Sequence, residues 1–233
     1  MQLLDFAPRA LLLDAMGTLV RLTPPGPRLR RELAARFGLS VSADEAERAV
    51  SAEIAYYRRH MHGAADAAGV SALHLAAAEA LRSGLPEDRR LPEVSSAELA
   101  EALLASLHFT LYPDALPALT RARRSGLRLV AVSNWDSSLP EVLDRVGVAA
   151  RLDGVITSAA AGAAKPDPAI FRAALAQAGV SAADAIHVGD SLKEDVAGAR
   201  AAGIRPVWLD RLGTGADAGV LTIASLRELT RLA

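Results

Sequence analysis

Short apolar runs that alternate with helical patterns constrain the fold of this chain more than any other feature. Five runs are apolar almost without interruption, at residues 9–13, 127–132, 155–157, 185–188 and 206–209. Unbroken apolar runs of this length are typical of strands that are buried on both faces of a parallel sheet. The later runs each follow a helical pattern, one of which begins at Ser138 with the capping-box spacing to Glu141 and ends at Gly147. The alternation predicts an α/β fold whose core is a doubly wound parallel (Rossmann-like) sheet.

The strand pattern is missing between residues 20 and 110. Helical patterns replace it at residues 28–37, 43–59, 71–81 and 95–107, with turn-forming Pro and Gly between them. We therefore predict two domains. Residues 1–20 and 111–233 form the sheet core, and residues 21–110 form an inserted all-helical domain.

Composition and charge exclude several classes of protein. The chain has 233 residues, no cysteine and a formal net charge of -1. Disulfides, thiolate metal sites and a cysteine nucleophile are therefore excluded, and no overall field would attract nucleic acid or an anionic membrane. The first residues lack the basic and apolar regions of a signal peptide, and the uncharged stretches are too short to span a membrane. We expect a cytoplasmic protein without nucleic-acid or membrane partners, either a monomer or a homodimer.

Polar residues follow the predicted strands at four places. Asp14 comes directly after the first apolar run, and Ser133 comes directly after the second. Lys165 precedes a helix start, and Asp190 follows the run at 185–188. In a doubly wound sheet, ligands bind beyond the carboxyl ends of the strands. The four side chains are therefore expected to converge at one edge of the sheet.

The fragments 11–19, 130–134, 165–168 and 188–195, in this order, resemble the four motifs of the haloacid dehalogenase-like (HAD) hydrolase superfamily. The resemblance covers nearly the whole chain and is specific in the predicted core. It implies the fold of that superfamily, with the helical insert as a cap that covers the site and contributes to substrate choice. It also implies a phosphatase that acts on a small phosphorylated metabolite, a phosphomonoester or an acyl phosphate. Asp14 would attack phosphorus and form an aspartyl-phosphate, which water then hydrolyses.

The same resemblance implies Mg²⁺ as the cofactor, held by oxygen ligands. Asp14 and Asp190 would supply carboxylates, and Met16 would supply its backbone carbonyl. Asp195 completes the predicted metal set, beside the ion or just behind it. A backbone carbonyl does not depend on the side chain, so metal binding should survive a Met at position 16.

The resemblance also implies how the phosphoryl group is held. Ser133 and the backbone N–H of Asn134 would bind the phosphoryl oxygens, and Lys165 would neutralise the nucleophile and the charge that develops in the transition state. Ser133 and Lys165 are therefore grouped with the nucleophile as catalytic residues. Gly17 and Thr18, in the turn after the nucleophile, complete the predicted substrate-binding set with Asn134.

Met16 is the informative departure from the phosphatase pattern, which usually has a second Asp there. That Asp protonates the leaving alkoxide and later activates water, and Met can do neither. Losing a general acid-base costs about 10²- to 10⁴-fold in rate, so acyl and aryl phosphates, whose leaving groups need little protonation, should react best. Asp136 is a candidate substitute acid, although local capping of a turn is the role we favour for it. His187 lies inside a predicted strand and is interpreted as a packed strand residue rather than a ligand.

Two alternatives stay open. Relatives that remove halide from 2-haloacids also lack the second Asp, and in that reaction Asp14 would attack carbon. The acidic residues Asp190 and Asp195 argue against this alternative, because dehalogenation requires no metal. The other alternative is a catalytically weak pseudo-enzyme that binds a phosphorylated ligand. Met16 supports it, and the joint presence of the other motif residues argues against it.

Overall fold

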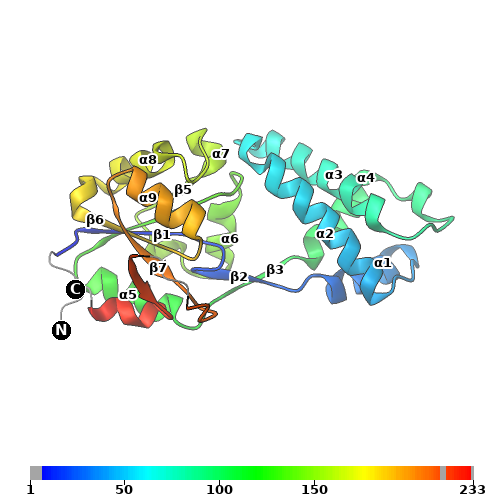
Figure 1. The fold of residues 1–233 in the computed structure, drawn as a ribbon. Coiled ribbons are helices and arrows are strands. Elements are labelled where there is room, and N and C mark those ends of the chain that lie inside the picture. Colours follow the sequence, from blue (N-terminus) through cyan, green and yellow to red (C-terminus); the bar gives the residue numbers. More distant parts are fainter. Residues whose placement is uncertain (1–6, 216–218, 232–233) are drawn as a thin grey trace. The chain divides into compact units, whose positions relative to one another are not determined.

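The computed structural model describes residues 7–215 and 219–231, and it divides into two compact units (Figure 1). One unit comprises the chain up to Arg21 and from Thr110 onward, and the other comprises Leu22–Phe109. The chain passes between them through two paired strands, β2 (Val20–Thr23) and β3 (His108–Leu111). The sequence pattern did not predict this pair of strands. Each strand has four residues, and Val20 is the only fully buried one among them, so they leave little apolar pattern.

Parallel strands form the main sheet, in the order β5-β4-β1-β6-β7-β8. Their bounds are β1 Ala10–Leu13, β4 Arg128–Ser133, β5 Gly154–Thr157, β6 Ala185–Gly189, β7 Arg205–Leu209 and β8 Leu221–Ile223. β1 lies between β4 and β6, and its Leu13 is opposite Ala131 of β4 and Val188 of β6. The predicted α/β fold with a parallel, doubly wound sheet and a helical insertion is confirmed. The short edge strand β8 was not expected, because Ile223 is its only buried residue.

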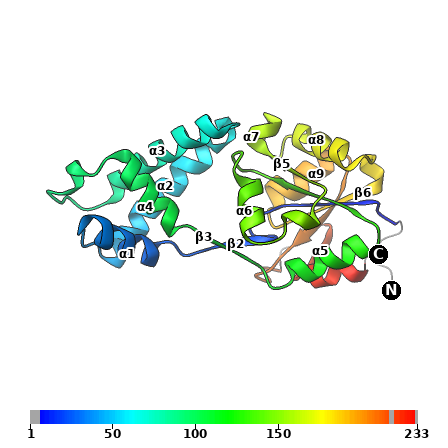
Figure 2. The ribbon, with the colours of Figure 1, turned by 180° about the vertical axis from the view of Figure 1, so that it is seen from behind.

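Helices cover both faces of the sheet, as a doubly wound fold requires. They are α5 Ala115–Arg124, α6 Leu139–Arg145, α7 Ser158–Ala161, α8 Pro168–Ala178 and α9 Ala197–Ala201, with the shorter turns η3 Ala149–Arg151, η4 Ala182–Asp184, η5 Leu192–Val196 and η6 Leu226–Arg231. α8 and α9 pack on the face that carries Leu12 and Val130, where Phe171 is fully buried. α5 and η6 lie together on the other side (Figure 2).

The ends of α6 and α8 show how local sequence sets helix boundaries. α8 begins as predicted, because the Asp167 carboxylate accepts the N–H of Ala169 at 2.8 Å, and it ends at Gly179, whose φ is 68°. The capping box predicted at Ser138 is wrong. Ser138 has helical backbone angles (φ -83°, ψ -7°) and its side chain makes no capping bond. The Asp136 carboxylate accepts the N–H of Ser138 at 2.7 Å instead.

The second unit is helical and has a core of its own. Its elements are α1 Gly26–Phe37, α2 Ala43–His60, η1 Met61–Gly63, α3 Ala67–Gly84, η2 Leu91–Glu93 and α4 Ser96–Ser106. Capping boxes at Ser42 and Ser95 start α2 and α4, and Leu33, Leu81 and Leu99 are fully buried between the helices. Within the described residues, no helix is both long and apolar enough to cross a membrane. The function of this unit as a cap stays a prediction.

Candidate active site

A tight turn carries the carboxylate of Asp14 at the end of β1. The Asp14 N–H donates to the carbonyl of Val188 at 2.9 Å, which ties the turn to β6. The chain then reverses at Gly17, whose φ of 82° favours glycine. A Cβ at Gly17 would lie 2.0 Å from Oδ2 of Asp190, so a glycine is also needed for the turn to approach this carboxylate. The turn therefore brings the first and last predicted motifs together.

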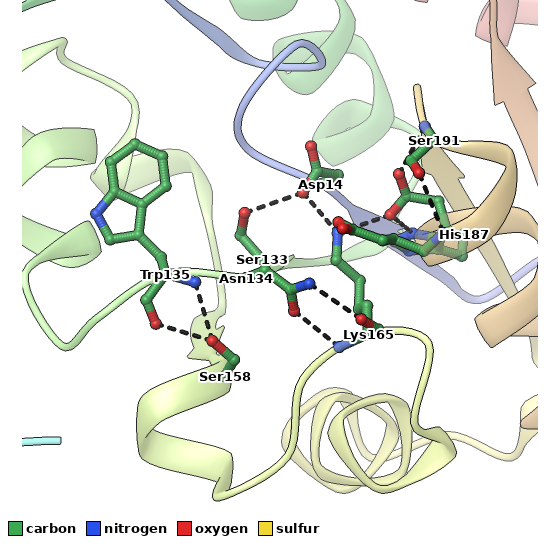
Figure 3. A network of polar contacts seen from close by, with 10 residues as sticks. Asp14, Ser133, Asn134, Trp135, Ser158, Lys165, His187 and Ser191 are labelled. Carbon is green, nitrogen blue, oxygen red and sulfur yellow. Dashed lines mark hydrogen bonds and ion pairs between the residues drawn. The ribbon is translucent and has the colours of Figure 1, made fainter. Parts of the chain in front are cut away.

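Two side chains from distant parts of the sequence bind the Asp14 carboxylate (Figure 3). The Ser133 hydroxyl, at the end of β4, donates to Asp14 Oδ1 at 2.9 Å. Lys165 Nζ donates to the same oxygen at 2.6 Å. All three side chains are nearly buried, with exposed fractions of the residues between 2% and 5%. Within the described residues, the hydrogen bonds of this carboxylate all go to Oδ1, which leaves Oδ2 for an attacking or metal-binding role.

The side chain of Asn134 holds the main chain of Lys165. Its Nδ2 donates to the Lys165 carbonyl at 3.0 Å, and its Oδ1 accepts the Lys165 N–H at 2.7 Å. Just beyond it, the Ser158 hydroxyl accepts the N–H of Trp135 at 3.0 Å and donates to the Trp135 carbonyl at 3.1 Å. From the sequence, a role was predicted only for the backbone N–H of Asn134. The contact of its side chain with the Lys165 main chain was not predicted. The two contacts fix the loop after β4 and, through it, the lysine (Figure 3).

Three carboxylates gather near the ammonium group of Lys165. Asp14, Asp190 and Asp195 can each place one oxygen within 4.8 Å of the others. Asp190 is exposed, while Asp195 is buried. Asp195 Oδ1 accepts from Lys165 Nζ at 2.6 Å and lies 2.8 Å from His187 Nε2, and its Oδ2 accepts the Ser191 N–H at 3.0 Å. Such an all-oxygen set fits a hard divalent cation such as Mg²⁺, with Asp195 more fully engaged by protein donors than Asp14.

The charges in the site are unbalanced. Burial raises the pKa of Asp14, although Lys165 limits the rise. Although Asp190 as a whole residue is exposed, desolvation of its carboxyl group and the charges of Asp14 and Asp195 raise its pKa to about 7. Burial would also raise the pKa of Asp195, but Lys165 and His187 hold it below its usual range. Burial alone would lower the pKa of Lys165, but Asp14 and Asp195 raise it. One ammonium thus faces three carboxylates, and a bound cation would relieve the excess negative charge.

The turn after Asp14 holds the other predicted residues. Met16 is half-buried and forms a bridge with Val20, and nothing in its environment tests the predicted role of its carbonyl. Thr18 is fully buried, and its hydroxyl has no hydrogen-bond partner within the described residues. Gly17 lines the acidic group, as described above.

Asp136 and His187 were considered as further polar groups. Asp136 is 1% exposed and bonds the backbone of Ser138, so it holds the turn, the role that we favoured, and does not reach the solvent as an acid. His187 is fully buried in β6 and meets the ring of Phe171 edge-on at 4.9 Å. It is a packed strand residue as predicted. Its contact with Asp195, eight residues further along in η5, was not predicted, because the sequence does not show how η5 folds back against β6.

Comparisons with known proteins identify the family of the chain. The family model for haloacid dehalogenase-like hydrolases matches residues 8–203. The chain is 42% identical over 132 residues to the phosphoserine phosphatase of Thermus thermophilus, which is 56% of this chain and 53% of the relative. It thus spans about half the length of this curated relative.

Solved structures share the whole architecture. A HAD phosphatase from Thermococcus onnurineus matches 96% of this chain and 97% of its own, with 28% identity and a TM-score of 0.65. The HAD-hydrolase YfnB from Bacillus subtilis, whose structure is bound to magnesium, matches 97% of this chain and 99% of its own, with 18% identity and a TM-score of 0.73. At that identity, the second likeness concerns the fold alone.

Proposed function

Since the chain belongs to the haloacid dehalogenase-like hydrolase family, we propose that it is a Mg²⁺-dependent phosphatase for a small phosphorylated metabolite. The observation that carries the proposal is the pairing of Asp14 Oδ1 with Ser133 Oγ and Lys165 Nζ beside two further carboxylates. A nucleophilic carboxylate needs an anchored orientation and nearby positive charge, and these contacts supply both. The phosphoserine phosphatase and the HAD phosphatase among the similar proteins support the same class of reaction.

In the proposed reaction, Asp14 Oδ2 attacks phosphorus and the bond to the leaving group breaks with its electron pair on the leaving oxygen. Ser133 keeps the carboxylate oriented, and Lys165 stabilises the charge on the phosphoryl oxygens. Water then attacks the aspartyl-phosphate, which releases inorganic phosphate and restores Asp14. Mg²⁺, held by Asp14 and Asp190 with Asp195 behind them, would reduce the repulsion between the nucleophile and the phosphate.

Substrate choice follows from Met16. The thioether cannot protonate a departing alkoxide, and Asp136 is buried in its turn. The enzyme is therefore proposed to act best on acyl phosphates and aryl phosphates, whose leaving groups depart as weak bases. Among phosphomonoesters with alkyl leaving groups, we expect slow turnover.

The dehalogenase alternative fits the residues less well. A 2-haloacid carries its own carboxylate and reacts without a metal, so nothing would offset its repulsion by Asp190 and Asp195, whereas Mg²⁺ would offset the same repulsion for a phosphate. The pseudo-enzyme alternative leaves the Lys165 contact to Asp14 without a catalytic purpose. Both alternatives are outcomes of the experiment below.

Hydrolysis of acetyl phosphate and p-nitrophenyl phosphate, with Mg²⁺ or with EDTA, tests the proposal. We expect turnover that depends on Mg²⁺, is abolished in Asp14→Asn and persists in Asp144→Asn, a control at an exposed position of α6. Acid-quenched protein should carry the mass of one phosphoryl group on the peptide that contains Asp14. Halide release from 2-chloropropionate without phosphate turnover would favour the dehalogenase, and binding of phosphate compounds without either reaction would favour the pseudo-enzyme.

A further inference from the structure

Arg211, in the loop after β7, holds the turn that follows Asp14. Its Nε donates to the carbonyl of Gly17 at 3.0 Å, and its Nη2 donates to the carbonyl of Thr18 at 2.7 Å. The residues of these pairs are 194 and 193 positions apart in the sequence. The Arg211 side chain is 15% exposed, so the contacts are sheltered from water. A single guanidinium thus binds two successive carbonyls of the turn.

The orientation of Arg211 is itself fixed. Its Nη1 and Nη2 donate to the two carboxylate oxygens of Asp114, at 2.9 and 3.0 Å. The Tyr112 ring lies under the guanidinium, with its centroid 3.8 Å from Cζ. The Ser225 hydroxyl and the Leu226 N–H donate to Asp114 Oδ2, at 2.7 and 2.9 Å. A planar guanidinium bound on two edges and stacked on a ring keeps one position far better than a lysine would.

The same turn also lies against the acidic group formed by Asp14, Asp190 and Asp195. Gly17 approaches Asp190 so closely that a Cβ would lie 2.0 Å from its carboxylate. A shift of the Gly17 carbonyl therefore moves one wall of the acidic group, together with the neighbouring Met16 and Asp14. Because the donors of Arg211 already bind the turn and Asp114, the side chain has little capacity left to bind a phosphate.

We propose that Arg211, oriented by Asp114 and Tyr112, is a positioning residue that fixes the turn after Asp14 and so sets the spacing between Asp14 and Asp190. Its catalytic consequence rests on the proposed function. Its structural consequence, a turn that is ordered by the guanidinium, is independent of the proposed function.

Hydrogen–deuterium exchange of the peptide that covers residues 14–21 tests the structural consequence in the 233-residue chain. Arg211→Lys keeps the charge but loses the planar fork, and we expect faster exchange in this peptide. Arg124→Lys, at an exposed position of α5, is the matched control and should leave the exchange unchanged. Should Arg211→Lys fail to fold, Asp114→Asn, which keeps the shape but loses the charge that orients Arg211, should also speed exchange.

The kinetic consequence is measured on the same variants with acetyl phosphate and Mg²⁺. We expect kcat to fall about 10- to 100-fold because the reacting groups are misplaced, with little change in KM. Exchange that matches the wild type, or an unchanged kcat, would overturn the proposal. If the wild type hydrolyses no phosphate, the proposed function fails, and the exchange comparison alone still decides whether Arg211 orders the turn.

Discussion

Lys165 Nζ lies 2.6 Å from Asp14 Oδ1, although 151 residues separate the two in the sequence. The contact joins the end of the first strand to the loop before α8. It places a cation on the carboxylate that is proposed to attack phosphorus, and Asn134 holds the lysine main chain on the other side. The pair therefore combines the proposed nucleophile and its counter-charge in one buried unit.

Replacing this lysine should remove most activity. In Lys165→Met, the buried carboxylates of Asp14 and Asp195 lose their counter-charge, and we expect kcat to fall by about 10²-fold or more. The free energy of unfolding should fall by about 3–5 kcal/mol, the cost of breaking a buried ion pair. Steady-state kinetics and urea denaturation measure the two effects. Lys193→Met is the control, because Lys193 is the other lysine of the chain and is exposed. Equal losses in both variants would contradict the assigned role.

A comparison of Ala substitutions at two glycines distinguishes the effect of backbone strain from that of a steric clash with Asp190. Gly17 and Gly126 have φ values of 82° and 80°, but a Cβ would meet the Asp190 carboxylate only at Gly17, and no atom lies within 4 Å at Gly126. Both Ala variants should lose about 1–2 kcal/mol of stability from the left-handed backbone. Only Gly17→Ala should also lose turnover, because it displaces Asp190. Melting temperatures and kcat values for the pair decide this, and a Gly126→Ala enzyme that is equally inactive would count against it.

Restoring an acid at position 16 should change substrate preference. In Met16→Asp, we expect turnover of alkyl phosphates to rise by about 10-fold or more, because the leaving alkoxide can now be protonated. Turnover of acetyl phosphate should change little, since acetate is a weak base. The measurement is the ratio of kcat/KM for the two substrates. Met16→Asn, which has a similar shape but no acid, should keep the wild-type ratio, and a rise in that variant would refute the explanation.

Stability of the helical unit should fall as pH rises through neutrality. Glu53 in α2 is 5% exposed, and burial raises its pKa to about 7 from the 4.5 of the unfolded chain. Because the folded state favours the protonated form, its contribution is complete below about pH 4.5 and is lost as pH rises through about 7, by at most about 3 kcal/mol. Urea denaturation at several pH values should show the decline in the wild type and a smaller one in Glu53→Gln. Glu47→Gln, at an exposed position of the same helix, should keep the full decline.

The sequence predicted where the polar residues of the candidate site lie, because their placement depends on local structure. Asp14, Ser133, Lys165 and Asp190 were expected at one edge of the sheet because each follows a strand or precedes a helix, and Ser133 and Lys165 each contact Asp14 directly. The alternation of apolar runs and helical patterns also predicted the parallel sheet. These features depend on residues within one element, so a single stretch of sequence contains the information.

Contacts between distant segments could not be predicted in this way. Nothing near Arg211 in the sequence indicates that its guanidinium binds the Gly17 and Thr18 carbonyls. Such contacts depend on strand order, β4-β1-β6-β7, which brings the loops after four strands together. The capping box at Ser138 failed for a different, local reason, because the carboxylate of Asp136, two residues earlier, accepts the Ser138 N–H that the box would have used, and Ser138 has helical backbone angles.

By itself, the sequence determined the class of fold and the Met at position 16, and it pointed to Asp14 as the candidate nucleophile, because strand burial, helix caps and residue identity are local properties. Only the tertiary structure decided which groups orient the Asp14 carboxylate, how Asp14 and Asp195 share Lys165, and how Arg211 anchors the turn. The physical reason is that hydrogen bonds and Coulomb interactions act over a few ångströms in space, and the distance between residues in space is set by the packed sheet rather than by their separation along the chain.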